Sequence, residues 1–96
     1  MTEAQATQYV DHDRARVTQW SFATAGDATG LHTHEFYYIV VPVTGGELTV
    51  VAEDGTATRM VQVAGVPYSG HAGTRHNVVS ASSYLVVFVE VELKLR

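Results

Sequence analysis

The stretch LHTHEFYY, residues 31–38, places two histidines one residue apart at the start of a run rich in strand-forming residues. Side chains on a strand alternate between its faces, so an extended segment projects His32 and His34 to the same side. Two imidazoles on one face indicate a metal site. Two surface histidines without a ligand give the same pattern, and the pair alone does not separate these interpretations.

The residues that follow this pair predict a strand over 36–43, where nearly every side chain is aromatic or β-branched. Alternation from His34 turns Phe36, Tyr38 and Val40 toward the same inner face. Glu35 then points away from the histidine pair. Tyr38 is therefore expected near any metal that the histidines bind.

The rest of the chain shows short alternating runs separated by turn residues, without a convincing helical period. Asp54-Gly55 is typical of a two-residue hairpin, because that turn needs positive φ values. Seven or eight strands of this kind predict an all-β antiparallel sandwich or barrel. The other main strands are expected at residues 15–23, 47–53, 56–63, 75–81 and 84–93.

The last predicted strand is apolar on both faces over most of its length. Val86 and Phe88 share one face, and Glu90 and Glu92 are expected to return that face to water. Large exposed apolar patches are rare in monomers. We therefore expect this strand to pack against a second sheet or another subunit, which makes a homodimer the predicted assembly.

Length and composition limit the remaining possibilities. The 96 residues predict one barrel domain over 14–96, preceded by a polar N-terminal arm, 1–13, that is either loose or lies along another subunit. The net charge of −4 argues against nucleic-acid binding, and no apolar run is long enough to cross a membrane. The first residues lack a signal-peptide pattern, so a cytoplasmic location is expected. There is no cysteine for disulfides or thiolate ligands.

A third histidine, His76, lies in another extended segment, RHNVV (residues 75–79). Three imidazoles form a borderline ligand set suited to Fe(II), Zn, Ni, Cu or Mn, and they leave coordination positions open for water or substrate. Sequence spacing does not itself show that His76 meets the other two.

Two spaced motifs give the chain a family resemblance. The first runs Gly26, five residues, His32, one residue, His34, three residues, Tyr38, six residues, Gly45. This frame resembles the first motif of the cupin superfamily at every spacing, with a tyrosine where cupins usually have a glutamate.

The second motif is also a pattern of glycines and histidines at fixed spacings. It runs Gly65, five residues, His71, one residue, Gly73, two residues, His76, three residues, Ser80. It resembles the second cupin motif, with His71 in place of proline and Ser80 in place of asparagine. Segments 38–46 and 88–94 also resemble small single-domain cupins linked to β-alanine degradation.

The resemblance implies a small cupin barrel of antiparallel strands, the double-stranded β-helix or jelly-roll-like fold. It implies that His32, His34 and His76 are metal ligands, and it leaves the identity of a fourth ligand open because of Tyr38. Three-histidine sites of this kind resemble those of cupin dioxygenases, which favours Fe(II), with Zn, Ni, Mn or Cu as other candidates. The expected substrate is a small, mostly hydrophobic molecule that can enolise or chelate.

Tyr38 and His71 are the candidate catalytic side chains. Tyr38 could orient substrate or water, donate a proton, or form an inert wall, and His71 could be a pocket acid or base or a surface histidine. The alternative function is a non-catalytic cupin that binds a metal or a small ligand. A metal-free structural cupin is the third interpretation.

Overall fold

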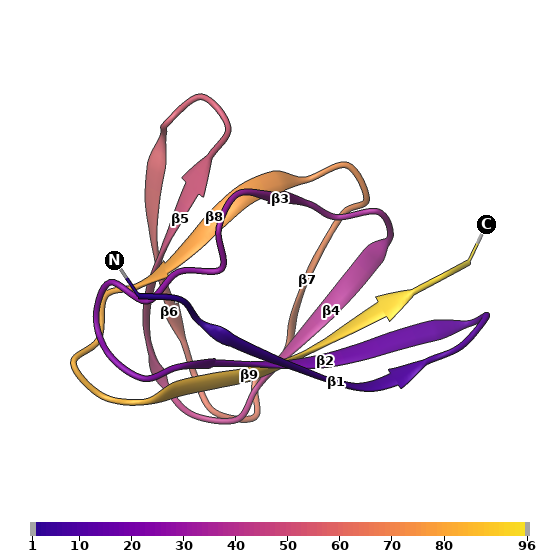
Figure 1. The fold of residues 1–96 in the computed structure, drawn as a ribbon, viewed down its shortest axis with the longest axis horizontal. Coiled ribbons are helices and arrows are strands. Elements are labelled where there is room, and N and C mark those ends of the chain that lie inside the picture. Colours follow the sequence, from indigo (N-terminus) through magenta and orange to yellow (C-terminus); the bar gives the residue numbers. More distant parts are fainter. Residues whose placement is uncertain (1, 96) are drawn as a thin grey trace.

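The computed structural model describes residues 2–95 and is built from strands (Figure 1). No segment in that range forms a helix that could span a bilayer. The strands are β1 (Gln5–Asp11), β2 (Ala15–Phe22), β3 (His32–Thr33), β4 (Tyr37–Pro42), β5 (Gly46–Ala52), β6 (Ala57–Gln62), β7 (Tyr68–Gly70), β8 (Arg75–Ser80) and β9 (Val86–Leu93).

The strands form two sheets. One has the order β1-β2-β9-β4-β7 and the other the order β3-β8-β5-β6, and every neighbouring pair is antiparallel. The chain passes repeatedly from one sheet to the other, so β9 lies between β2 and β4 although it comes last (Figure 1). The prediction of an all-β antiparallel fold is confirmed.

The core lies between the two sheets and follows from the period-two alternation of the strands. Phe22, Leu48 and Val86 are fully buried at its centre. The inward orientation predicted for Phe36, Tyr38 and Val40 is confirmed, because all three side chains are buried.

The predicted hairpin at Asp54-Gly55 is also confirmed, but the two-residue turn is not: the Ala52 N–H donates to the carbonyl of Thr56 across a loop of three residues, 53–55, and Asp54 has no positive φ. It joins β5 to β6, with Val51 opposite Ala57 in the ladder. Gly55 has a φ of 90°, a left-handed conformation that glycine adopts without steric cost. The Asp54 carboxylate accepts a hydrogen bond from the backbone N–H of Thr56 at 2.9 Å, which closes the turn.

One prediction about β9 is wrong. Glu90 and Glu92 do not return to water but remain inside, with 9% and 5% of their surface exposed. Arg16 of β2 lies opposite Glu92 in the ladder and binds its carboxylate with two hydrogen bonds. The oppositely charged Arg16 offsets part of the cost of desolvating Glu92, whereas Glu90 faces His34 and has no such partner within residues 2–95.

Most of the predicted N-terminal arm forms a strand. Residues 5–11 make up β1, which pairs with β2 at the edge of the five-stranded sheet. Every residue of β1 is exposed, so no alternation of apolar and polar side chains marked it as a strand.

Candidate metal centre

The loop before β3 fixes the position of the histidine pair. Asp27 is buried, and its carboxylate accepts hydrogen bonds from the backbone N–H groups of Ala23 and Thr24 and from the Thr2 hydroxyl. Backbone hydrogen bonds also join this loop to β8, including one that the Ser80 N–H donates to the Asp27 carbonyl. The loop therefore enters β3 in a defined register.

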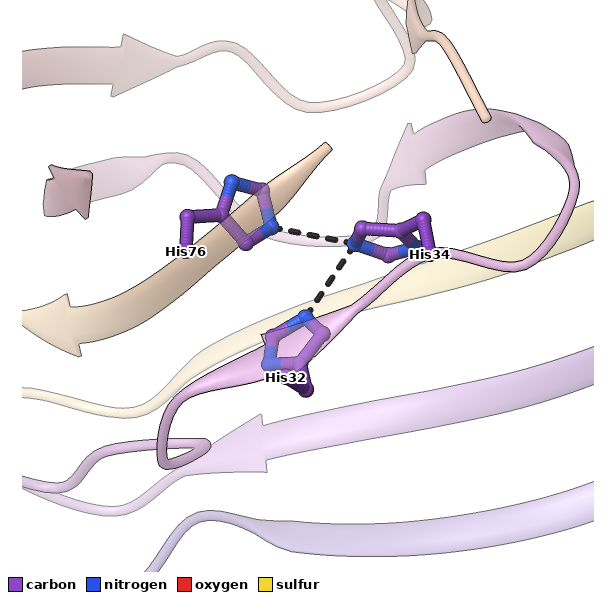
Figure 2. Close-up of side chains that lie close together, drawn as sticks. All are labelled: His32, His34 and His76. Carbon is purple, nitrogen blue, oxygen red and sulfur yellow. Dashed lines mark hydrogen bonds between the residues drawn. The ribbon is translucent and has the colours of Figure 1, made fainter. Parts of the chain in front are cut away.

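That register brings the three histidines together. His32 of β3 is the direct antiparallel partner of His76 of β8. His34 follows β3, and its backbone N–H donates to the carbonyl of Thr74. The Nε2 atom of His34 lies 3.1 Å from His32 Nε2 and 3.0 Å from His76 Nε2 (Figure 2). The three rings converge edge to face, with centroids 4.8 to 4.9 Å apart.

The protonation of the rings bears on what they can bind. Burial, together with the neighbouring histidines, lowers the pKa of His34 to about 4, and burial and His32 lower the pKa of His76 to about 4. Both imidazoles are therefore neutral at pH 7. His32 Nδ1 lies 2.8 Å from the carbonyl oxygen of Gly30, which only accepts hydrogen bonds, so Nδ1 is the donor and the neutral tautomer of His32 has its lone pair on Nε2.

This arrangement leaves at least one contact without a well-directed hydrogen bond. His34 Nε2 faces two other nitrogens, and a single N–H points at only one of them. With the His34 proton on Nδ1, the Nε2 lone pairs of His34 and His32 face each other at 3.1 Å. A divalent cation removes that conflict by accepting all three lone pairs, so the donor set fits a transition metal ion.

Tyr38 packs directly on this cluster. Its ring stacks on the His34 imidazole with centroids 3.8 Å apart and an angle of 20° between the planes. A Cβ atom on Gly70 would lie 2.2 Å from both Cζ and Oη of Tyr38, so the hydroxyl end of the ring rests against β7. Burial and the charge of Glu90 raise the pKa of Tyr38, and a hydrogen bond with Thr74 opposes that shift.

Two buried carboxylates stand behind His34, and the sequence analysis missed both. Glu90 Oε1 lies 3.9 Å from His34 Nδ1, and Glu92 binds Arg16 at 2.6 and 2.7 Å. Burial and the neighbouring charge of Glu92 raise the pKa of Glu90 to about 7, while Arg16 acts in the opposite direction. The sequence did carry one indication of their position: side chains alternate along the last strand, which puts both glutamates on the same face as Val86 and Phe88.

A cavity of about 190 Å³ opens beside the three histidines. Most of its exposed wall is apolar, and besides the three histidines its polar groups come from Thr29, Tyr38, Tyr68, Ser69 and Glu90. A second hollow on the other side of His32 and His34 extends toward β1 and Arg16. The apolar wall of the first cavity includes Trp20, Val40, Val50, Met60, Val78 and Phe88.

His71 lies apart from the three histidines. Its side chain is exposed, and its ring centroid lies 6.0 Å from that of Tyr37, whose side chain is also exposed. The backbone carbonyl of His71 accepts hydrogen bonds from the N–H and the hydroxyl of Thr74. The structure thus brings Tyr38 to the predicted metal ligands and leaves His71 at the surface.

The two-sheet barrel and its inward histidines define a small cupin, and comparison with known proteins agrees. The chain is 44% identical over 92 residues to the β-alanine degradation protein BauB of Pseudomonas aeruginosa, a match that covers 96% of this chain and 95% of that protein. The chain belongs to the cupin family, among the small RmlC-like members. No family model matches it.

Solved structures support the same assignment. A cupin domain from Bordetella pertussis Tohama I superposes with a TM-score of 0.92 and 37% identity, covering 98% of this chain and 96% of that one. A conserved protein with a double-stranded β-helix domain from Klebsiella pneumoniae gives a TM-score of 0.76 at 19% identity, covering 96% and 77%. The second likeness shows the fold alone.

Proposed function

We propose that this cupin is a metal-dependent enzyme of the dioxygenase type that acts on a small enolisable or chelating organic molecule. In this proposal, His32, His34 and His76 hold one divalent transition metal ion, with Fe(II) favoured. The observation that carries the proposal is the convergence of three Nε2 atoms, at 3.0 and 3.1 Å, on the wall of a largely apolar cavity.

Three neutral ligands suit this chemistry. When bound, the ion would keep its full +2 charge and supply Lewis acidity toward an anionic or enolised substrate. A dioxygenase adds both atoms of O₂ to its substrate, so the substrate supplies the electrons and no external reductant is needed. The protein would contribute ligand geometry through the β3–β8 register and a water-poor wall through Trp20 and Phe88.

The size of the cavity limits the substrate. A space of about 190 Å³ admits a small molecule, and the apolar wall favours one that has few polar groups. The relative BauB takes its name from β-alanine degradation. That name supports a small organic acid as the substrate class of this chain.

A non-catalytic metal-binding or ligand-binding cupin is the second candidate. The placement of the two predicted catalytic side chains favours it, because Tyr38 directs its hydroxyl end toward Gly70 and His71 is exposed. Neither provides an obvious proton donor beside the three histidines. In this alternative, the histidines bind the ion and the cavity captures a ligand without turnover.

Oxygen consumption separates the two candidates. Protein loaded anaerobically with Fe(II) is mixed with a panel of β-diketones, small thiols and keto acids, and O₂ uptake is followed with an electrode. The enzyme proposal expects stoichiometric O₂ uptake with at least one class, and loss of that uptake in His34→Ala. Tight ligand binding without O₂ uptake would instead support the binding protein.

We also propose that the chain works as a cytoplasmic homodimer. Support for the dimer comes from β1, which lies at the edge of its sheet, is exposed at every residue and includes the large apolar side chains Tyr9 and Val10. An exposed edge strand offers unpaired backbone groups to a second copy. Light scattering coupled to size exclusion tests the dimer: a mass of twice 10.4 kDa supports it and a monomer mass contradicts it.

A further inference from the structure

The His34 imidazole presents its two nitrogens to different groups. Its Nε2 atom faces His32 and His76, while its Nδ1 atom faces Glu90. Among residues 2–95, potential ligand atoms that gather within 4.8 Å form two clusters. One contains the three histidines, and the other contains His34, Glu90 and Glu92, so His34 is the residue they share.

The geometry argues against Glu90 as a fourth ligand of an ion held by the three histidines. The carboxylate approaches Nδ1, whereas the histidine cluster forms at Nε2, and the two nitrogens point to different sides of the ring. Glu90 also does not gather with His32 and His76 in the first cluster. Its place is therefore behind the imidazole that would bind the ion.

Glu92 is fixed by another partner. Both of its oxygens accept hydrogen bonds from the Arg16 guanidinium, in a bidentate geometry that holds the carboxylate in place. Glu90 stands two residues earlier on the same face of β9, with its Oε1 atom 3.9 Å from His34 Nδ1. At 3.9 Å the two atoms are too far apart for a direct hydrogen bond, so this carboxylate acts on the imidazole by electrostatic attraction to an Nδ1–H group.

We infer that Glu90 is a positioning residue for His34: its carboxylate keeps the proton on Nδ1 and leaves the Nε2 lone pair directed at the metal. This inference rests on the proposed metal-binding function. Metal-bound histidines commonly hold their other nitrogen against a carboxylate, which fixes the tautomer and the ring orientation. Here the stacked Tyr38 ring fixes the plane of the imidazole, and Glu90 fixes which nitrogen is protonated.

Two substitutions test this role. Glu90→Leu removes the carboxylate but keeps much of the side-chain volume, and it removes a buried group whose charged form is costly to desolvate. Glu90→Gln keeps a partially negative amide oxygen on the side chain that faces Nδ1. Glu47→Gln is the control, because it removes a surface carboxylate that pairs with Arg59 and is remote from the histidines.

The first readout is the tautomer of His34 in metal-free protein, observed by ¹⁵N–¹H correlation of the imidazole rings. Native protein, Glu90→Gln and Glu47→Gln are expected to show His34 protonated at Nδ1. Glu90→Leu is expected to show a mixture of tautomers. An unchanged Nδ1–H signal in Glu90→Leu overturns the inference, whether or not the native protein binds a metal.

The second readout is the affinity for Co(II) or Zn(II), measured by competition with a chromophoric chelator. Loss of a carboxylate behind a histidine ligand typically weakens metal binding by about 10- to 100-fold. We expect that loss in Glu90→Leu and much less in Glu90→Gln. Equal affinity in Glu90→Leu and native protein contradicts the inference. A native protein that binds neither metal contradicts the proposed function instead, and the tautomer comparison still decides the role of Glu90.

Discussion

His32 and His76 are direct partners across the β3–β8 ladder, although 43 residues separate them in sequence. A backbone register thus sets their spacing, and His34 then reaches both rings with a single nitrogen. Because strand pairing alone positions two of the three candidate ligands, the proposed metal site is preorganised. The residues around the three histidines lead to several testable predictions.

Tyr38 depends on the absence of a side chain at position 70. A Cβ atom there would lie 2.2 Å from the phenol ring, so Gly70→Ala forces Tyr38 off the His34 imidazole. We expect a loss of about 1–3 kcal/mol in the free energy of unfolding, measured in urea, as for other overpacked cores. Gly45→Ala is the matched control, because its nearest contact would be an ordinary 3.6 Å. Equal stability of the two variants would show that Tyr38 moves freely.

Arg16 neutralises a buried carboxylate. Arg16→Met leaves Glu92 buried and unpaired, and breaking a buried ion pair costs about 3–5 kcal/mol. We expect Arg16→Met to lower the free energy of unfolding by about 2–4 kcal/mol, because 28% of the Arg16 side chain is exposed and water screens part of the charge. Chemical denaturation measures it. The double variant Arg16→Met/Glu92→Leu should recover most of the loss, and failure to recover would mean that Arg16 acts through packing.

The buried Asp27 carboxylate is expected to make folding stability fall at low pH. Hydrogen bonds from Thr2, Ala23 and Thr24 lower the pKa of its carboxyl below the ordinary value of 3.8, against the opposing effect of burial. A carboxyl with a lower pKa in the folded state stabilises the protein above its unfolded pKa, and the effect disappears as the pH falls through the folded pKa. Thermal melts between pH 2 and 6 should therefore show a shallower acid decline in Asp27→Asn. An acid decline as steep as in the exposed-site control Asp13→Asn would contradict this role.

Met60 is expected to limit substrate size. It extends from β6 to the wall of the 190 Å³ cavity. Met60→Ala enlarges that space, so the preferred chain length in a series of alkyl-substituted β-diketones should increase, as judged by binding to metal-loaded protein. Val61→Ala is the control on the same strand, because Val61 is exposed. An unchanged preference in Met60→Ala would mean that the substrate occupies another part of the site.

Much of the fold was predictable from local patterns. Alternation placed Phe36, Tyr38 and Val40 inside, and Asp54-Gly55 marked its hairpin because the turn conformation depends on the glycine itself. Strand β1 was not predictable in this way. All its residues are exposed, so pairing with β2 is its main link to the fold and leaves no apolar periodicity in the sequence.

The site was predictable only in part. Motif spacing identified the three histidines that the structure brings together. Alternation also assigned Glu90 and Glu92 to the face of Phe88, yet it carries no information on burial. Glu92 is paired inside the protein by Arg16, which lies 76 residues away from it in sequence and meets it only through the β2–β9 register. Such long-range charge pairing has no local sequence signal.

The most direct test of the account is metal stoichiometry. Protein is produced without a histidine tag and analysed by mass spectrometry of the elements, next to His76→Ala and the exposed-site control His12→Ala. The account predicts close to one transition metal ion per chain in native protein and His12→Ala, and almost none in His76→Ala. Native protein without stoichiometric metal, even after anaerobic incubation with Fe(II) or Zn(II), would contradict it.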